Sequence, residues 1–218
     1  MAGFCSIVLQ GVAGPNYELL STECGMNGRI NDSQVWNESK FKEEISDPKN
    51  PLNLTQEHLF VADDAYPLSE HLLKPYTGDH LDFKCSVFNY RLSRARRIIE
   101  NVFGIMAMMF RVLLVTINIS PERACDVVLA VCVLHNFLIA HKSAAPAYLY
   151  QSVDTNDEDN GAWRKKVDLT LVTAAGKSVN NGPKKGTQTR NALCDHFMTE
   201  GAVDFQWKMV GKVLHSKC

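Results

Sequence analysis

The chain has 218 residues, 45% of them hydrophobic, which suffices to bury one sizeable core and favours a single domain with appendages over two domains. Its longest apolar run, residues 127–134, is shorter than the roughly 20 residues of a membrane span, and the first residues lack the cationic start of a secretory signal. We therefore expect a globular protein inside the cell, with no transmembrane helix and no membrane partner.

The formal net charge of −1 hides a polarised distribution. Residues 1–83 carry 5 basic and 13 acidic groups, residues 84–160 carry 8 and 7, and residues 161–218 carry 10 and 4. An acidic front could hold cations and a basic rear could face an acidic polymer, although solvated surfaces also produce such splits. The seven cysteines include no Cys-x-x-Cys pair, so neither a disulfide framework nor a zinc knuckle is indicated.

The first predicted element is a hairpin. Residues 4–12 and 17–24 contain β-branched and aromatic side chains and are separated by a Gly-Pro-Asn turn. A glycine-rich break follows, after which Asp32 or Ser33 is expected to cap one short helix. This part of the chain therefore predicts two paired strands and then a helix.

A short buried strand is predicted at residues 58–62, HLFVA. It ends in a polar loop that begins with Asp63 and Asp64. In α/β sheets, ligands gather at the carboxyl ends of strands, so this loop is a candidate binding position.

The clearest helical period runs from residue 88 to about residue 110. Its aliphatic and aromatic residues fall in one arc, which must face the core. The other face is rich in arginine, and residues 84–111 contain six basic side chains but only one acid, Glu100. Gly104, one turn later, leaves room for a ligand to approach that carboxylate.

A second helix is predicted at residues 121–141, opened by Ser120 and Pro121. Its apolar residues lie almost all round, which predicts burial. Cys132 and His135 are three residues apart and could bind a metal, but their apolar surroundings favour a core histidine.

Beyond this helix the composition indicates exposed linkers. Residues 142–161 and 175–189 are rich in small and polar side chains. A short strand at residues 167–172 and a short helix at residues 191–198 are predicted between and beyond them.

Three acids stand in separate settings: Asp32 after a glycine-rich turn, Asp63 at a strand end and Glu100 in a basic helix. Magnesium and manganese take oxygen ligands, and two such ions can clamp a phosphoryl displacement. Each acid also has an ordinary role: a helix cap, a turn acid, or a partner of Arg96 or Arg97 at helical spacing. Taken one residue at a time, the ordinary roles are favoured.

Several common catalytic motifs are absent from the sequence. It contains no Gly-x-Gly-x-x-Gly or Walker loop, no Gly-x-Ser-x-Gly elbow and no zinc-hydrolase helix. We therefore expect no nucleotide cofactor and no serine-hydrolase chemistry.

A family resemblance rests on a set of motifs in chain order. They are GFCSIVLQGV, NYELLSTECGMNGRINDSQVWNES, HLFVADDAYPLSEHLLKPY, FNYRLSRARRIIENVFGIMAMMFRVL and AVCVLHNFL, with a weaker match at RNALCDHFMTEGAVDFQW. Together they resemble the PIF/Harbinger-type transposases and their domesticated nuclease relatives, a branch of the DDE superfamily of endonucleases. The combination is far more specific than any single motif.

The resemblance implies an α/β, RNase H-like fold, in which helices flank a mixed sheet and acids hold divalent magnesium or manganese to cut DNA. By position, Asp63 and Glu100 correspond to catalytic, metal-binding acids, and Asp32 to a further metal ligand. Four basic residues would face DNA phosphates: Arg91, Arg94, Arg96 and Arg97.

The sequence also departs from the family pattern. The family's first catalytic aspartate lies on the first, central strand, upstream of the position of Asp32, whereas residues 1–31 contain no aspartate. We therefore expect a nuclease domain at residues 1–142 that lacks this strand and one ligand, with impaired activity. An acidic linker at 143–162 and a partly disordered extension at 163–218 are expected to follow.

Three hypotheses follow from these observations. The leading one is a transposase-derived, metal-dependent DNA endonuclease domain, active or inactive. The alternative is a domesticated non-catalytic module that binds DNA or protein, and a third possibility is a gene-model fragment. DNA is the expected partner and a separate DNA-binding protein is a further candidate. The DNA substrate predicts a nuclear location, with the cytoplasm as the alternative.

Overall fold

A computed structural model describes residues 6–47, 49, 58–141 and 183–215, and side chains up to residue 211. Two compact units can be distinguished. Unit 1 comprises residues 1–30 and 97–173, and unit 2 comprises residues 31–96 and 174–218. Helix α3, Phe83–Met109, contributes its first half to unit 2 and its second half to unit 1.

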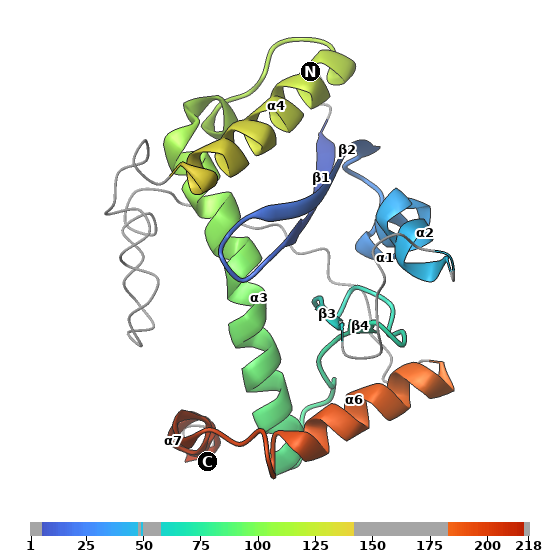
Figure 1. Cartoon of the computed structure of the whole chain (residues 1–218), viewed down its shortest axis with the longest axis vertical. Helices are drawn as coiled ribbons and strands as arrows, with labels where there is room; N and C mark the ends of the chain where they lie inside the picture. Colours follow the sequence, from blue (N-terminus) through green and yellow to red (C-terminus); the bar gives the residue numbers. More distant parts are fainter. Residues whose placement is uncertain (1–5, 48, 50–57, 142–182, 216–218) are drawn as a thin grey trace. The chain divides into compact units, whose positions relative to one another are not determined.

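Unit 1 begins with the predicted hairpin, which is confirmed as strands β1, Ile7–Ala13, and β2, Leu19–Asn27, paired antiparallel. Helix α4, Pro121–Ala140, packs against β2 (Figure 1). The amide of Asn136 fixes this contact, because its Oδ1 accepts from Leu19 N and its Nδ2 donates to Leu19 O, both at 2.8 Å. A helix side chain thus completes the hydrogen bonding of a strand residue.

The core of unit 1 lies between the hairpin, the second half of α3 and α4. It includes Leu19, Val102, Met106 and Val131, so the predicted core arc of α3 is confirmed. Gly11 allows the close approach of strand and helix, because a Cβ there would lie 3.2 Å from Phe103 Cζ. A short 3-10 helix η1, Arg111–Leu114, follows α3.

Helix α4 is less buried than its composition predicted. Cys132 and His135 are in the core as expected, and His135 Nε2 lies 2.8 Å from Tyr17 O. Val133, Leu134 and Phe137 are nevertheless exposed. The all-round burial predicted for this helix is therefore wrong, because the described residues of unit 1 leave one side of the helix uncovered. In the described part of the chain, α4 is the single helix whose length and composition would suit a membrane span, a test that core helices also pass.

Unit 2 begins with two short helices where one was predicted, α1, Asp32–Glu38, and α2, Lys40–Ser46. Ser39 separates them with an extended backbone. Its hydroxyl donates to Trp36 O at the end of α1 and accepts from Lys42 N at the start of α2. A serine that caps one helix and ends another explains the break.

The predicted strand is confirmed in short form as β3, Phe60–Val61, which pairs parallel with β4, Leu72–Leu73. Sequence patterns did not predict β4. Two further helices complete unit 2, α6, Lys184–His196, and α7, Asp204–His215. The core cluster joins the strands, the first half of α3 and α6 through Leu68, Leu73, Phe88, Leu92 and Cys194.

The carboxyl-terminal region differs from the prediction where it is described. Helix α6 begins at Lys184, so the linker expected through residue 189 is wrong for its last residues. Gly186 lets α6 pack on the Ser69 backbone, because a Cβ there would lie 2.7 Å from Ser69 O. The predicted strand at 167–172 and the acidic linker at 143–162 lie outside the described residues. The fold is thus mixed α/β, and its described strands form two separate pairs, β1-β2 and β3-β4.

Candidate functional site

Asp32 lies in the first turn of α1 and is not the residue that caps this helix. Asn31 is the capping residue, and its Oδ1 accepts a 2.8 Å hydrogen bond from Gln34 N. The predicted capping role of Asp32 or Ser33 is therefore wrong. Asparagine and aspartate cap helices about equally well, so sequence alone could not decide between neighbours.

Asp63 starts the turn that follows β3, and several elements of unit 2 hold this turn. Asp63 Oδ1 accepts from Ala65 N at 3.0 Å, so Asp63 is also a turn acid. Ser33 from α1 donates its hydroxyl to Ala65 O at 2.6 Å. Lys74, just beyond β4, donates from Nζ to Asp64 O at 3.1 Å. The turn is therefore tied to α1 and to the end of β4.

The Asp32 and Asp63 carboxyl groups are electrostatic neighbours. Burial raises the pKa of Asp32 above its ordinary value, and the charge of Asp63 raises it further. Two half-buried carboxylates that repel each other favour a cation between or beside them.

The positively charged guanidinium of Arg96 faces Asp63. Arg96 of α3 places an NH2 nitrogen 3.8 Å from Asp63 Oδ2, and the two side chains are 27% and 25% exposed. The carboxylate thus has one oxygen held by the turn and the other turned towards positive charge. This donor set suits a hard divalent ion, for which carboxylate oxygens are ordinary ligands.

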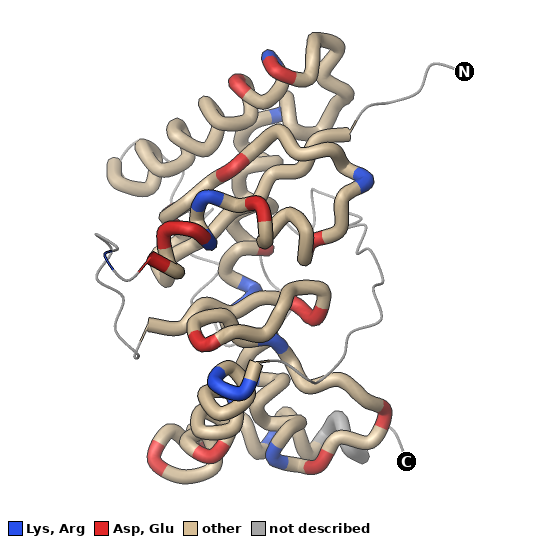
Figure 2. Tube along the Cα trace, turned by 90° about the vertical axis from the view of Figure 1, so that its right-hand side faces the viewer, with Lys and Arg blue, Asp and Glu red and all other residues tan. Residues whose placement is uncertain are grey.

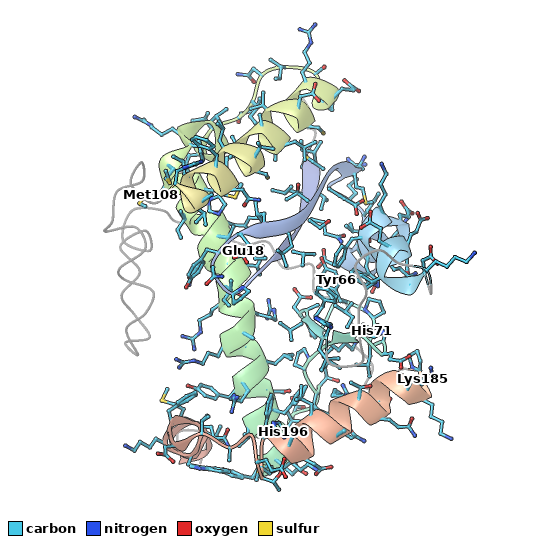
Figure 3. The ribbon with its side chains drawn as sticks, in the orientation of Figure 1. Glu18, Tyr66, His71, Met108, Lys185 and His196 are labelled. Carbon is cyan, nitrogen blue, oxygen red and sulfur yellow. The ribbon has the colours of Figure 1, made fainter. Side chains whose placement is uncertain are left out.

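Tyr66 completes the surroundings of the two acids, and motif reasoning assigned it no role. It lies beside α1 (Figure 3), and its ring packs edge-on against Trp36 with 6.2 Å between centroids. Burial raises its pKa to about 12, with contributions from the charges of Asp32 and Asp63, whereas Arg96 acts in the opposite direction. Tyr66 is therefore a neutral phenol at physiological pH. The Ala-Tyr-Pro sequence after the acids was the available signal.

Lys74 is a second residue that sequence reasoning missed. Its side chain is buried, with 6% exposure, and burial lowers its pKa while the charge of Asp64 acts in the opposite direction. A buried lysine beside the Asp63–Asp64 turn is a candidate functional residue. Nothing in the local sequence distinguishes it from a surface lysine, because its burial depends on the β3-β4 pairing.

Glu100 lies in the second half of α3, which belongs to unit 1, one helical turn after Arg96. It is partly buried. The structure therefore brings Asp32 and Asp63 together within unit 2, whereas the convergence of Glu100 with them stays a prediction. Among the residues that the structure describes, no group of three or more His, Cys, Asp or Glu side chains is placed to hold a metal ion.

The four arginines predicted to face DNA have different surroundings. Arg91 NH1 donates to Gly201 O and Gln206 Oε1, both at 3.0 Å, and its guanidinium lies 4.3 Å from the Phe197 ring centroid. Arg91 thus fastens α3 to the segment that leads into α7. Arg94 lies 4.5 Å from the ring centroid of Phe205.

The carboxyl-terminal part of the chain that Arg91 and Arg94 contact carries charges of both signs. Helices α6 and α7 and the segment between them contain acidic as well as basic residues (Figure 2). Whether Arg91, Arg94, Arg96 and Arg97 contact DNA stays a prediction.

Comparison with known proteins places these residues in a family context. The profile of the DDE superfamily endonucleases matches residues 3–136 of the chain. A curated relative, Protein ALP1-like from Arabidopsis thaliana, is 27% identical over 143 residues, which are 62% of this chain and 35% of the relative. The chain thus spans about a third of the length of that relative. No solved structure shows a significant match to the chain.

Proposed function

The chain belongs to the DDE superfamily of endonucleases, and from this membership we propose that it is a transposase-derived domain that binds magnesium or manganese and acts on DNA phosphodiesters. The observation that carries the proposal is the pair of neighbouring carboxylates, Asp32 in the first turn of α1 and Asp63 in the turn that follows β3. Both residues fall within the matched range. We further propose that the strands and helices belong to an RNase H-like arrangement.

The roles of the individual residues follow from their positions. Asp63 and Glu100 are the proposed catalytic acids, and Asp32 adds a third carboxylate for the metal. A bound divalent ion would supply charge to stabilise the phosphoryl transition state and would activate water. The Asp63 turn, held through Ser33 and Lys74, supplies the rigidity that such a site requires.

Tyr66 suits a positioning role beside the acids. Its phenol stays protonated at physiological pH, so it can donate a hydrogen bond to a carboxylate or to a phosphate oxygen. The basic residues of α3 would bind the DNA backbone, to which arginine is suited by its planar set of donors. A nuclear location and a separate DNA-binding partner protein go with this proposal, and the cytoplasm remains the alternative location.

The acids available within this sequence limit the expected activity. Residues 1–31 contain no aspartate, so the proposed set is Asp32, Asp63 and Glu100. We expect the chain alone to cleave DNA slowly, because one principal ligand of the family pattern has no counterpart here.

A plasmid-nicking assay with manganese tests this function. We expect slow conversion of supercoiled to nicked plasmid that requires the metal and falls at least about tenfold in Asp63→Asn and Glu100→Gln, since each removes a proposed ligand charge. Asp64→Asn is the matched control, because it neutralises the exposed neighbour of Asp63 in the same turn. Equal nicking by all four proteins would contradict the catalytic assignment.

A non-catalytic module that binds DNA or protein is the second candidate. The feature that favours it is the basic balance of residues 161–218, which have 10 basic and 4 acidic groups. Such a module would bind DNA equally well in chelator and in manganese and would nick none of it.

A further inference from the structure

Arg96 and a divalent cation bound through Oδ2 would compete for the same oxygen of Asp63. Oδ1 of this carboxylate is engaged with Ala65 N at 3.0 Å, and Oδ2 faces the Arg96 guanidinium at 3.8 Å. An ion bound through Oδ2 would therefore approach the positive charge of Arg96. Two cations at such short range repel each other strongly in a half-buried position.

We propose that Arg96 is an exchangeable counter-ion of Asp63, which occupies the carboxylate before metal binds and moves to a DNA phosphate when substrate arrives. This inference rests on the proposed function and adds regulation to it. The binding of metal and the binding of DNA then support each other, because metal would displace Arg96 from Asp63 and a DNA phosphate would draw Arg96 away from Asp63.

The strength of the Asp63–Arg96 pair suits such an exchange. The nitrogen–oxygen distance of 3.8 Å is at the long end for an ion pair, and both side chains are about one-quarter exposed to solvent. Pairs of this kind hold weakly and are open to competition by solvent ions. Arginine is also the side chain best suited to the alternative partner, since its planar donors match phosphate oxygens.

The turn itself does not depend on Arg96. Ser33 donates a hydrogen bond to Ala65 O at 2.6 Å, and Lys74 donates one to Asp64 O at 3.1 Å. The Asp63 side chain accepts a hydrogen bond from Ala65 N. These contacts stay in place when the guanidinium leaves. Asp63 would therefore keep its orientation towards the metal throughout the exchange.

The first test measures manganese affinity in the absence of DNA, by titration calorimetry on the full chain. We expect Arg96→Gln to bind manganese about two- to fivefold more tightly than the wild type, the range of a weak ion pair. Arg97→Gln is the control, because it removes the same charge from the adjacent position and should change the affinity less. Arg96→Lys keeps the charge and should keep affinity near the wild-type value, and circular dichroism checks that each variant is folded.

The second test measures coupling. Fluorescence anisotropy gives the affinity for a short DNA duplex with a nuclease-resistant backbone, in chelator and in manganese. The measured quantity is the affinity for DNA in manganese divided by the affinity in chelator. This ratio should be larger in the wild type and in Arg97→Gln than in Arg96→Gln, because coupling between two ligands is reciprocal. The ratio cancels the proposed DNA contact that Arg96→Gln and Arg97→Gln each lose.

The outcomes separate this inference from the proposed function. Manganese binding that Asp63→Asn abolishes but that is equal in Arg96→Gln and Arg97→Gln overturns the exchange alone. Equal coupling ratios in all variants overturn it as well. Absence of carboxylate-dependent manganese binding in every protein overturns the proposed function, and the inference with it.

Discussion

At the scale of single residues, Asp32 is under two opposing influences. Its place in the first turn of α1 favours a negative charge, because the helix dipole is positive there. Burial and the neighbouring charge of Asp63 nevertheless raise its pKa above 3.8. The ionised carboxyl group is therefore destabilising in the metal-free fold, as expected of a ligand that a cation would stabilise.

This raised pKa predicts a pH-dependent effect of Asp32→Asn. Because the folded pKa lies above the unfolded value, the native state holds its proton more tightly, and ionisation of Asp32 lowers stability as pH rises through the two values. In chelator at pH 7 the variant should therefore melt at a higher temperature than the wild type. At a pH well below 3.8 the difference should vanish, as thermal unfolding followed by circular dichroism can check.

The opposite order of the two melting temperatures would contradict the environment that we assign to the Asp32 carboxyl group. If Asp32→Asn melts lower than the wild type at pH 7 in chelator, then the charged carboxylate stabilises the fold and does not face a repulsive neighbour. Glu38→Gln, at the exposed end of the same helix, is the control for loss of one negative charge.

Motif reasoning found the two acids but not their supporting residues. Asp32 and Asp63 stand in motifs with a recognisable order, and the structure makes them neighbours. Tyr66 and Lys74 were missed because their significance depends on burial against Trp36 and on the β3-β4 pairing. These contacts join segments distant in sequence, which local patterns do not reveal.

At the scale of elements, Gly186 determines how closely α6 can pack. An added Cβ would lie 2.7 Å from Ser69 O and 3.0 Å from Ser69 Cα, and these are backbone atoms that cannot turn away as a side chain would. Gly186→Ala should therefore destabilise the protein by about 1–3 kcal/mol, the usual cost of overpacking. Urea unfolding measures the change.

Gly211 in α7 provides the matched control. A Cβ at this helical position would meet nothing within 4 Å. Gly211→Ala should leave stability unchanged or increase it by up to about 1 kcal/mol through helix propensity. A stabilising effect of Gly186→Ala comparable to that of Gly211→Ala would refute the close packing of α6 on Ser69.

The elements differ in how well sequence predicted them. The long helix α3 was found because a 3.6-residue period repeats over several turns, and α4 was found because Ser120 and Pro121 open a long apolar stretch. Strand β4 has only two residues, too few for any alternation, and α6 begins in a Lys-Lys-Gly-Thr stretch that resembles a linker. Short strands and polar helix starts depend on tertiary packing.

At the scale of the whole molecule, the three proposed catalytic and metal-binding acids are distributed between the two units. Asp32 and Asp63 belong to unit 2, and Glu100 belongs to the part of α3 in unit 1. The family match covers part of each unit, since it runs from residue 3 to residue 136. Sequence resemblance could thus name all three acids, whereas the structure gives a shared environment to two.

The central claim is that the carboxylates of this chain bind a divalent cation. Manganese titration followed by electron paramagnetic resonance tests it most directly, on the wild type, Asp63→Asn, Glu100→Gln and the control Asp64→Asn. We predict saturable binding to the wild type and to Asp64→Asn, and binding weakened at least about tenfold in the other two variants, because each loses a charged ligand. Binding of equal strength in all four proteins, or binding in none, would contradict the claim.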